Sequence, residues 1–374
     1  MNASRCKRVV VVASLADSLV NFRGPLLRRL VASGHEVTAL APPSPSIAAQ
    51  LAEWGVNFES IPLERTGLNP LRDIRLLLHL SRALRRLRPD CVLTYTIKPV
   101  VYGCIAARIA RVSTIGAMIT GLGFAFTEGT GTTRSVTRRV ARSLYSIALR
   151  AATVVFFQNP DDRNLFVTLG LLHGTRVVMI DGSGVDLDHF APTPLPQRTS
   201  FLMIARLVRD KGVQEYVDAA RLLRRSQPEV PCVLAGWLDT NPAAFSAADL
   251  KHWVEEGAVQ YVGVLEDVRS ALAECSVYVL PSYREGTPRT VLEAMSMGRA
   301  AITTDVPGCR ETVVDGESGV LVPVRDAEAL AAAMLGFIAE PSRAASMGAA
   351  ARRRAEAKYN VHNVNDVIAA ALDL

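Results

Sequence analysis

Short runs of apolar, largely β-branched residues alternate with longer amphipathic segments along most of this chain. This order predicts parallel β-sheets covered by helices, because parallel strands need a crossover segment between them. The run Val9–Val12 is typical of a strand buried on both faces. Basic residues precede it, as in a secretion signal, but the apolar run is too short and the polar pair Asp17 and Ser18 soon follows.

The alternation occurs in two sets. The first set of expected strands is Arg8–Ala13, His35–Ala41, Asn57–Ile61, Cys91–Tyr95, Ile115–Ile119, Thr153–Gln158 and Val177–Ile180. Expected helices among them include Pro25–Ser33, Pro70–Arg88 and Thr133–Arg150. The second set of expected strands is Ser200–Ile204, Val230–Ala235, Val259–Val262, Val277–Leu280, Ala300–Thr303 and Gly319–Val322. Its expected helices are Lys211–Gln227, Val268–Glu274, Pro288–Met297 and Asp326–Ala339.

Three prolines between the two sets, Pro192, Pro194 and Pro196, end regular structure and predict a hinge. We therefore expect an α/β protein of two Rossmann-like, doubly wound domains facing a cleft. Residues 1–190 form the first domain and residues 191–358 the second, with an amphipathic helix at 359–374 crossing back onto the first. One domain would hold a donor and the other an acceptor. Ligands of open parallel sheets bind beyond the carboxyl ends of the strands.

Composition excludes several classes of protein. With 49% apolar and 21% charged residues, the chain is not intrinsically disordered. Its 6 cysteines include no two that are three residues apart, so they indicate neither a zinc site nor a disulfide framework, and a reducing cytosol fits them. No run of about 18 uncharged apolar residues is present, since Arg108 and Arg111 interrupt the best candidate.

Positive charge is concentrated in the first half. Residues 1–190 hold 23 basic and 13 acidic residues (+10), whereas residues 191–374 hold 19 and 23 (−4). The expected helices Pro70–Arg88 and Thr133–Arg150 carry much of this charge beside apolar residues, which suits an anionic membrane surface. The alternative is that both are the solvated outer faces of sheet-covering helices. No nucleic-acid motif is present, so nucleic acid is not expected as a partner.

The most informative segment, Pro281–Ala294, follows an expected strand and opens a helix, with Thr287 as the expected N-cap and Pro288 in the first turn. A helix start after a glycine loop offers N–H groups and a positive dipole end to a diphosphate. Glu285 and Glu293 flank this start. Because carboxylates repel phosphate, hydroxyls of a sugar and of a ribose are their expected partners. The alternative is that both are ordinary helix charges.

A second segment, Ile204–Gly212, follows the first strand of the second domain. Its Arg206 and Lys211 lie five residues apart across a strand-to-helix turn. From there, both side chains can neutralise a diphosphate, Arg as a planar fork and Lys as a point charge. The alternative is a basic surface turn.

Together these segments resemble the retaining glycosyltransferases of family 4, whose pattern is a glutamate, seven intervening residues and a second glutamate. Glu285 and Glu293 have this spacing with the usual Glu-Gly-x-Pro start, and Arg206 and Lys211 match the family's phosphate-binding pair. The resemblance covers nearly the whole chain and continues in segments 308–311 and 315–322. It implies the two-domain GT-B fold with a nucleotide-sugar donor held mainly by the second domain.

The resemblance also implies roles for single residues. Arg206 and Lys211 would hold the diphosphate and stabilise the leaving group, and Glu285 would contact the donor sugar; these three form the expected catalytic set. Glu293 would contact the ribose. The rest of the expected donor-binding set consists of glycines and one threonine: Gly286, Thr287, Gly184 and Gly236.

Shorter motifs are similar to enzymes that extend polyprenyl-diphosphate-linked sugars, of the bacillosaminyl-diphospho-undecaprenol N-acetylgalactosaminyltransferase and capsule types. These motifs are Asn21–Arg23, Thr96–Pro99, Gly121–Thr127 and Ala235–Asp239. They imply an acceptor side made of Asn21, Arg23, Lys98, Gly121 and Gly123. Many family members have a histidine in the loop after the fourth strand, where this chain has Thr96 and Lys98, so no histidine-assisted step is expected.

The implied mechanism needs no metal and no cofactor. Fixed cations and helix N–H groups stabilise the charge that develops on the leaving diphosphate. The acceptor hydroxyl attacks from the face that the leaving group vacates, and the departing phosphate accepts its proton, so a carboxylate nucleophile is not required. Asp186 and Asp188 match the Asp-x-Asp metal motif of a different glycosyltransferase architecture, but they lie at the expected hinge.

The sequence thus predicts a retaining hexosyltransferase in bacterial surface glycan synthesis, peripheral on the cytoplasmic face of the plasma membrane. It would move an N-acetylhexosamine from a UDP-sugar to an undecaprenyl-diphosphate-linked saccharide. Three alternatives remain open: a transferase with a soluble acceptor, a sugar-nucleotide epimerase on the same fold, and a non-catalytic nucleotide-sugar-binding subunit.

Overall fold

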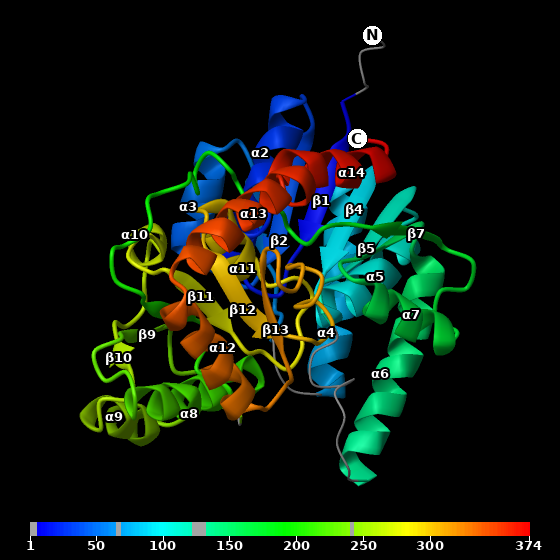
Figure 1. Ribbon diagram of the computed structural model, residues 1–374. Helices are drawn as coiled ribbons and strands as arrows, with labels where there is room; N and C mark the ends of the chain where they lie inside the picture. The colour runs from blue at the N-terminus through cyan, green and yellow to red at the C-terminus, as the bar shows by residue number, and fades with distance from the viewer. Residues whose placement is uncertain (1–5, 65–68, 122–131, 240–242) are drawn as a thin grey trace. The chain divides into compact units, whose positions relative to one another are not determined.

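The computed structural model describes residues 6–64, 69–121, 132–239 and 243–374 (Figure 1). The chain divides into two compact units, Met1–Ser183 with His362–Leu374, and Gly184–Val361. Each unit is built on a fully parallel sheet with helices between its strands, which confirms the predicted fold class. The division lies before the proline-rich stretch, and residues 362–374 belong with the first unit.

The first unit holds a 7-stranded sheet in the order β3-β2-β1-β4-β5-β6-β7. The strand bounds are β1 Arg8–Val12, β2 Glu36–Ala41, β3 Asn57–Ser60, β4 Cys91–Tyr95, β5 Thr114–Ile119, β6 Val154–Phe157 and β7 Arg176–Met179. Its helices are α1 Asp17–Asn21, α2 Gly24–Ala32, α3 Pro45–Glu53, α4 Pro70–Leu87, the π-helical η1 Pro99–Gly103, α5 Cys104–Ile109, α6 Thr132–Ala151, α7 Pro160–Thr168 and α14 Val361–Ala371.

The four valines of β1 show why this sheet is buried on both sides. Successive side chains of a strand point to opposite faces, so Val10 and Val12 join the core under α4 to α7, whereas Val9 and Val11 join the core under α1 to α3. The C-terminal helix α14 packs into that second core through Val364 and Ile368, and Leu372 joins them directly after the helix (Figure 1).

The second unit holds a 6-stranded sheet in the order β10-β9-β8-β11-β12-β13. The strand bounds are β8 Phe201–Ile204, β9 Cys232–Ala235, β10 Gln260–Tyr261, β11 Val277–Leu280, β12 Ala300–Thr304 and β13 Gly319–Val322. Its helices are the 3₁₀ turn η3 Arg209–Lys211, α8 Val213–Arg224, α9 Ala247–Glu255, α10 Arg269–Ala273, α11 Arg289–Ser296, α12 Ala327–Ala339 and α13 Ser342–Lys358.

A buried arginine ties the proline-rich stretch to the second unit. Arg299 is fully buried, and its guanidinium donates to the carbonyl oxygens of Thr193 at 2.7 Å and Pro194 at 3.0 Å. It also donates to the carbonyl oxygens of Leu272 at 2.8 Å and Ala273 at 3.1 Å. One buried cation therefore pairs with carbonyl groups of the proline-rich stretch and of the end of α10.

Two predicted helix starts are wrong. The helix expected from Lys211 begins at Val213, because Gly212 adopts a left-handed φ of 73° and ends the short 3₁₀ turn before it. The helix α11 has Pro288 and not Thr287 as its N-cap, and the Pro288 side chain forms no capping hydrogen bond. Among the described residues, no helix is both long and apolar enough to cross a membrane.

Candidate active site

The loops that carry the predicted donor residues all follow the carboxyl ends of strands in the second unit. Arg206 follows β8, Asp239 follows β9, Glu285 follows β11, and the turn at Gly308 follows β12. These four strands are parallel neighbours in the order β9-β8-β11-β12, so their carboxyl ends lie at one edge of the sheet. This is the edge at which parallel α/β sheets bind ligands.

Arg206 is held by a carboxylate from the neighbouring loop. Its Nη1 donates to Asp239 Oδ2 at 2.8 Å, and both side chains are mostly buried. The two loops approach closely because Gly236 has a φ of 141° and a Cβ there would lie 1.7 Å from the Ala205 carbonyl oxygen. Backbone packing is enough to require a glycine at 236, and the predicted donor contact of Gly236 stays a prediction.

Lys211 and Glu285 form an ion pair between the loops after β8 and β11, and their side chains are only 22% and 12% exposed. Two bonds to the Asp210 carbonyl oxygen fix this contact: the Tyr283 N–H donates at 2.9 Å and the Ser282 hydroxyl at 3.0 Å. The sequence therefore brings the predicted catalytic lysine and glutamate together across 74 residues.

The turn after β12 packs against the loop that carries Glu285. The Glu285 N–H donates to the Pro307 carbonyl oxygen at 3.0 Å. Gly308 has a φ of 83°, and a Cβ there would lie 2.2 Å from the Glu285 carbonyl oxygen. The Gly308 N–H in turn donates to Glu311 Oε2 at 2.7 Å. The position of Glu285 thus depends on a glycine and a second glutamate that sequence reasoning did not place at the site.

Glu293 lies inside the unit rather than on a solvated helix face. It is 6% exposed, and Arg289 Nε donates to its Oε1 at 2.7 Å, one helical turn away. Burial raises the pKa of Glu293, and the attraction of Arg289 offsets part of this rise. The spacing of four residues between Arg289 and Glu293 was a signal in the sequence for this pair.

The remaining predicted donor residues are Gly286 and Thr287, which lie beside Glu285 in the sequence, and Gly184, the first residue of the second unit. Gly286 and Thr287 follow Glu285 directly and lead into α11. Gly184 has a φ of 70°, and a Cβ there would lie 2.6 Å from Val361 Cα, because Val185 pairs with the segment at Tyr359 and Asn360. The close approach of the backbone at Val361 explains why residue 184 is a glycine. The predicted donor contact of Gly184 stays a prediction.

The predicted acceptor residues belong to the first unit. Asn21 is exposed at the end of α1, and Gly121 has a φ of 132°. Arg23 is buried, with Nη2 2.7 Å from Met118 Sδ. Lys98 Nζ donates to Asp73 Oδ1 at 2.9 Å, and both side chains are largely buried. Gly123 lies outside the described residues. Within the first unit Arg23 therefore contacts Met118, and Lys98 forms an ion pair with Asp73. The predicted contacts of these residues with an acceptor stay predictions.

The part of the chain that the structure describes contains no cluster of metal ligands. No group of three or more His, Cys, Asp or Glu side chains there could hold an ion. Asp186 of the Asp-x-Asp motif forms a turn instead, accepting the backbone N–H groups of Asp188 at 3.2 Å and His189 at 3.0 Å.

Models of two known protein families match the two units of this chain. The model for glycosyl transferases group 1 matches residues 186–354, and the glycosyl transferase 4-like domain matches residues 23–182. A relative from Campylobacter jejuni is an N,N'-diacetylbacillosaminyl-diphospho-undecaprenol alpha-1,3-N-acetylgalactosaminyltransferase, 28% identical over 337 residues that cover 86% of this chain and 87% of that one. A relative from Escherichia coli is a UDP-Gal:alpha-D-GlcNAc-diphosphoundecaprenol alpha-1,3-galactosyltransferase, 25% identical over 74% of this chain and 73% of that one.

Solved structures agree on the fold. Sucrose-phosphate synthase from Thermosynechococcus elongatus superposes with a TM-score of 0.81 at 19% identity, covering 97% of this chain and 98% of that one. Anabaena HepE, solved in complex with UDP, superposes with a TM-score of 0.75 at 19% identity, covering 98% and 99%. Two family models that together span both parallel sheets, and the recurrence of this fold, show that the chain is an enzyme of the group 1 and 4-like glycosyltransferases with the GT-B fold.

Proposed function

We propose that this enzyme is a retaining, metal-independent glycosyltransferase that moves an N-acetylhexosamine from a UDP-sugar to an undecaprenyl-diphosphate-linked saccharide. The observation that carries the proposal is the placement of two ion pairs, Arg206–Asp239 and Lys211–Glu285, on loops at the carboxyl edge of the second sheet. The printed activities of the Campylobacter and Escherichia relatives support the lipid-linked acceptor.

The two cations supply the chemistry of leaving-group departure. As the bond from the anomeric carbon to the diphosphate breaks, negative charge grows on the phosphate oxygens. Arg206 and Lys211 are oriented by Asp239 and Glu285, respectively, so little reorganisation is needed to stabilise that charge. The start of α11 adds the positive end of its dipole.

The two glutamates fit binding roles better than a nucleophilic one. Glu285 shares its carboxylate with Lys211, and Glu293 is paired with Arg289 inside the unit. We therefore assign Glu285 to hydroxyls of the donor sugar and Glu293 to the ribose. In this proposal the acceptor hydroxyl attacks from the face that the diphosphate vacates, and a phosphate oxygen takes its proton.

The first unit would bind the acceptor, at the cytoplasmic face of a bacterial membrane. Its helices α4 and α6 carry many arginines beside apolar residues, which suits an anionic bilayer on which a lipid-linked acceptor resides.

The test begins with a panel of nucleotide sugars, because a ligand that binds only the native state raises the unfolding temperature. The donor that protects is then supplied with a polyprenyl-diphosphate-linked saccharide, and the product's anomeric configuration is read by NMR. We expect a retained configuration and undiminished rates in a metal chelator. Epimerisation of the free donor without transfer would indicate a sugar-nucleotide epimerase instead. Binding of the donor without any turnover would indicate a non-catalytic binding subunit.

Matched variants separate the site from general charge effects. Lys211→Ala and Glu285→Ala are expected to abolish transfer while the fold persists. Lys251 and Glu255 form a comparable pair on the exposed face of α9, with side chains 73% and 64% exposed. Lys251→Ala and Glu255→Ala are expected to keep wild-type rates, since exposed pairs contribute little. Wild-type transfer by Lys211→Ala or Glu285→Ala would refute the assignment.

A further inference from the structure

The outer surface of α4, α5 and α6 combines exposed apolar residues with arginines. The outward stripe of α4 begins with Leu71, 79% exposed, and continues through Ile74 and Leu78 before arginines take over. On α5 and α6 the exposed apolar residues are Ile109 and Ile147. Because α5 contacts both other helices, these stripes share one outer layer of the first unit.

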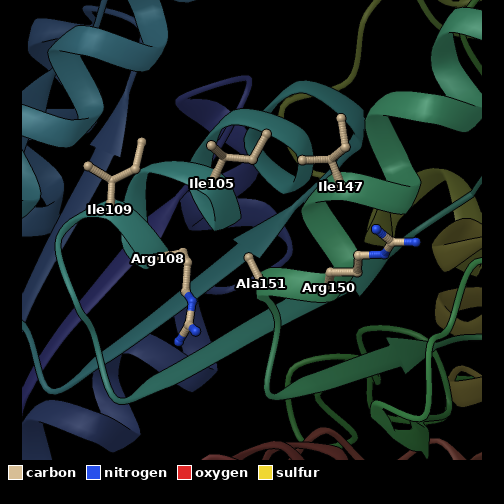
Figure 2. Close-up of a pocket in the computed structure, with 6 residues that line it drawn as sticks. All are labelled: Ile105, Arg108, Ile109, Ile147, Arg150 and Ala151. Atoms are coloured by element: carbon tan, nitrogen blue, oxygen red, sulfur yellow. The ribbon is translucent and has the colours of Figure 1, made fainter.

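A hollow of about 290 Å³ opens between α5 and α6 in this surface. Its apolar lining is Ile105, Ile109, Ile147 and Ala151. Figure 2 shows the remaining two lining residues, Arg108 from α5 and Arg150 from α6, on either side of Ala151. Both arginines are exposed, and neither forms an ion pair with a described carboxylate.

The surrounding chain is strongly cationic. Residues 74–160 contain 13 Lys and Arg residues but only two carboxylates, Asp90 and Glu128. Lys98 and Arg86 of this set pair with Asp73 and Glu59, which precede the range. The hollow therefore joins an apolar floor to a surface with more basic than acidic side chains. A purely aqueous anion would gain nothing from exposed isoleucines, whereas a lipid phosphate beside acyl chains would use both features.

The hollow is separate from the edge that carries the predicted acceptor residues. The helices α5 and α6 end at Ile109 and Ala151, just before β5 and β6 begin, so the hollow lies near the amino ends of these strands. Lys98 and Gly121 follow the carboxyl ends of β4 and β5. The two sites therefore lie at opposite edges of the first sheet.

We propose that this hollow binds the headgroup phosphate of an anionic phospholipid in a bilayer. Arg108 and Arg150 would donate to the phosphate oxygens. Ile109 and Ile147 would enter the boundary between headgroups and acyl chains, with the apolar stripe of α4 on the same surface. The inference rests on the proposed membrane partner and not on the donor chemistry.

The experiment is co-sedimentation of the full chain with vesicles of phosphatidylcholine alone or mixed with phosphatidylglycerol, at low and high salt. Binding to the anionic vesicles only, and its weakening by salt, is expected. At about fivefold for each surface arginine, Arg108→Gln with Arg150→Gln is expected to weaken binding about 25-fold. Ile109→Asn with Ile147→Asn is expected to weaken it at both salt concentrations, because that contribution is apolar.

A matched control lies in the second unit, where Arg225 is exposed and Val254 has the same 43% exposure as Ile109. Arg225→Gln with Val254→Asn is expected to leave vesicle binding unchanged, and thermal unfolding checks that every variant folds. Equal binding to both vesicle types, or wild-type binding by the Arg108 and Arg150 double variant, would overturn the proposal. Release of the protein from vesicles by inorganic phosphate at constant ionic strength would assign the hollow to free phosphate and overturn the lipid assignment.

The same samples distinguish this inference from the proposed function. Transfer to a detergent-solubilised acceptor is expected to survive all four substitutions in the hollow. Vesicle binding without any transfer would refute the proposed reaction alone, and transfer without vesicle binding would refute the lipid site alone.

Discussion

Substitution of Gly308 by alanine is expected to damage the candidate active site from a position that bears no functional group. A Cβ at this residue would lie 2.2 Å from the carbonyl oxygen of Glu285 and 2.6 Å from that of Gly286. Both neighbours are backbone atoms, so no side-chain rotation can relieve the overlap. The Glu285 loop must move, and the Lys211 contact must move with it.

The structure supplies a control that separates steric displacement from backbone strain. Gly308 and Gly316 have similar left-handed φ values of 83° and 75°, but a Cβ at Gly316 would meet nothing within 4 Å. The left-handed conformation costs a non-glycine residue about 1–2 kcal/mol, which both variants share. Overpacking costs about 1–3 kcal/mol more, and only Gly308→Ala incurs it.

The assay pairs denaturant unfolding with steady-state transfer. Gly308→Ala is expected to be about 1–3 kcal/mol less stable than Gly316→Ala. It is also expected to lose about 10²-fold in kcat, since a misplacement of about 1 Å at a catalytic group can have that effect. Gly316→Ala is expected to keep the wild-type kcat. Equal stability and equal kcat in the two variants would refute the idea that Gly308 positions Glu285.

Three further outcomes follow from buried charges. Arg299→Met is expected to lower the unfolding free energy by about 1–3 kcal/mol in a denaturant titration, because it leaves the buried Leu272 carbonyl group, and the partly buried carbonyl groups of Thr193 and Pro194, without this donor. Burial raises the pKa of Glu293, so the native state binds that proton more tightly than the unfolded state. The stability of the wild type relative to Glu293→Gln should therefore rise as pH falls toward the ordinary value of 4.5, measured by paired unfolding curves. Asp239→Asn removes the carboxylate that orients Arg206 and should weaken UDP binding in calorimetry; unchanged or tighter binding would contradict that orienting role.

Much of the fold could be predicted because its strands are continuous apolar runs. The expected bounds of β4, β11 and β13 agree with the structure, and those of the other strands differ by one or two residues at an end. Two helices of the second unit escaped prediction. The helix α13 is rich in alanine and lacks a clear apolar period, and α9 begins with a capping box whose third residue is Asp249 in place of the usual Glu or Gln.

The candidate site was predictable only in part, for a physical reason. Arg206, Lys211 and Glu285 each follow a strand end, so the parallel topology brings them to one edge. Their partners lie far away in the sequence: Asp239 is 33 residues from Arg206. The glycines were harder still. A sequence does not distinguish a glycine that makes room for a ligand from one that makes room for backbone, as at Gly184 and Gly236.

The most direct test is a crystal structure of the enzyme with uridine diphosphate. We predict that the phosphate oxygens lie within hydrogen-bond distance of Arg206 and Lys211, with the uridine ribose toward Glu293. A nucleotide bound away from the carboxyl edge of the second sheet, touching neither cation, would contradict the account.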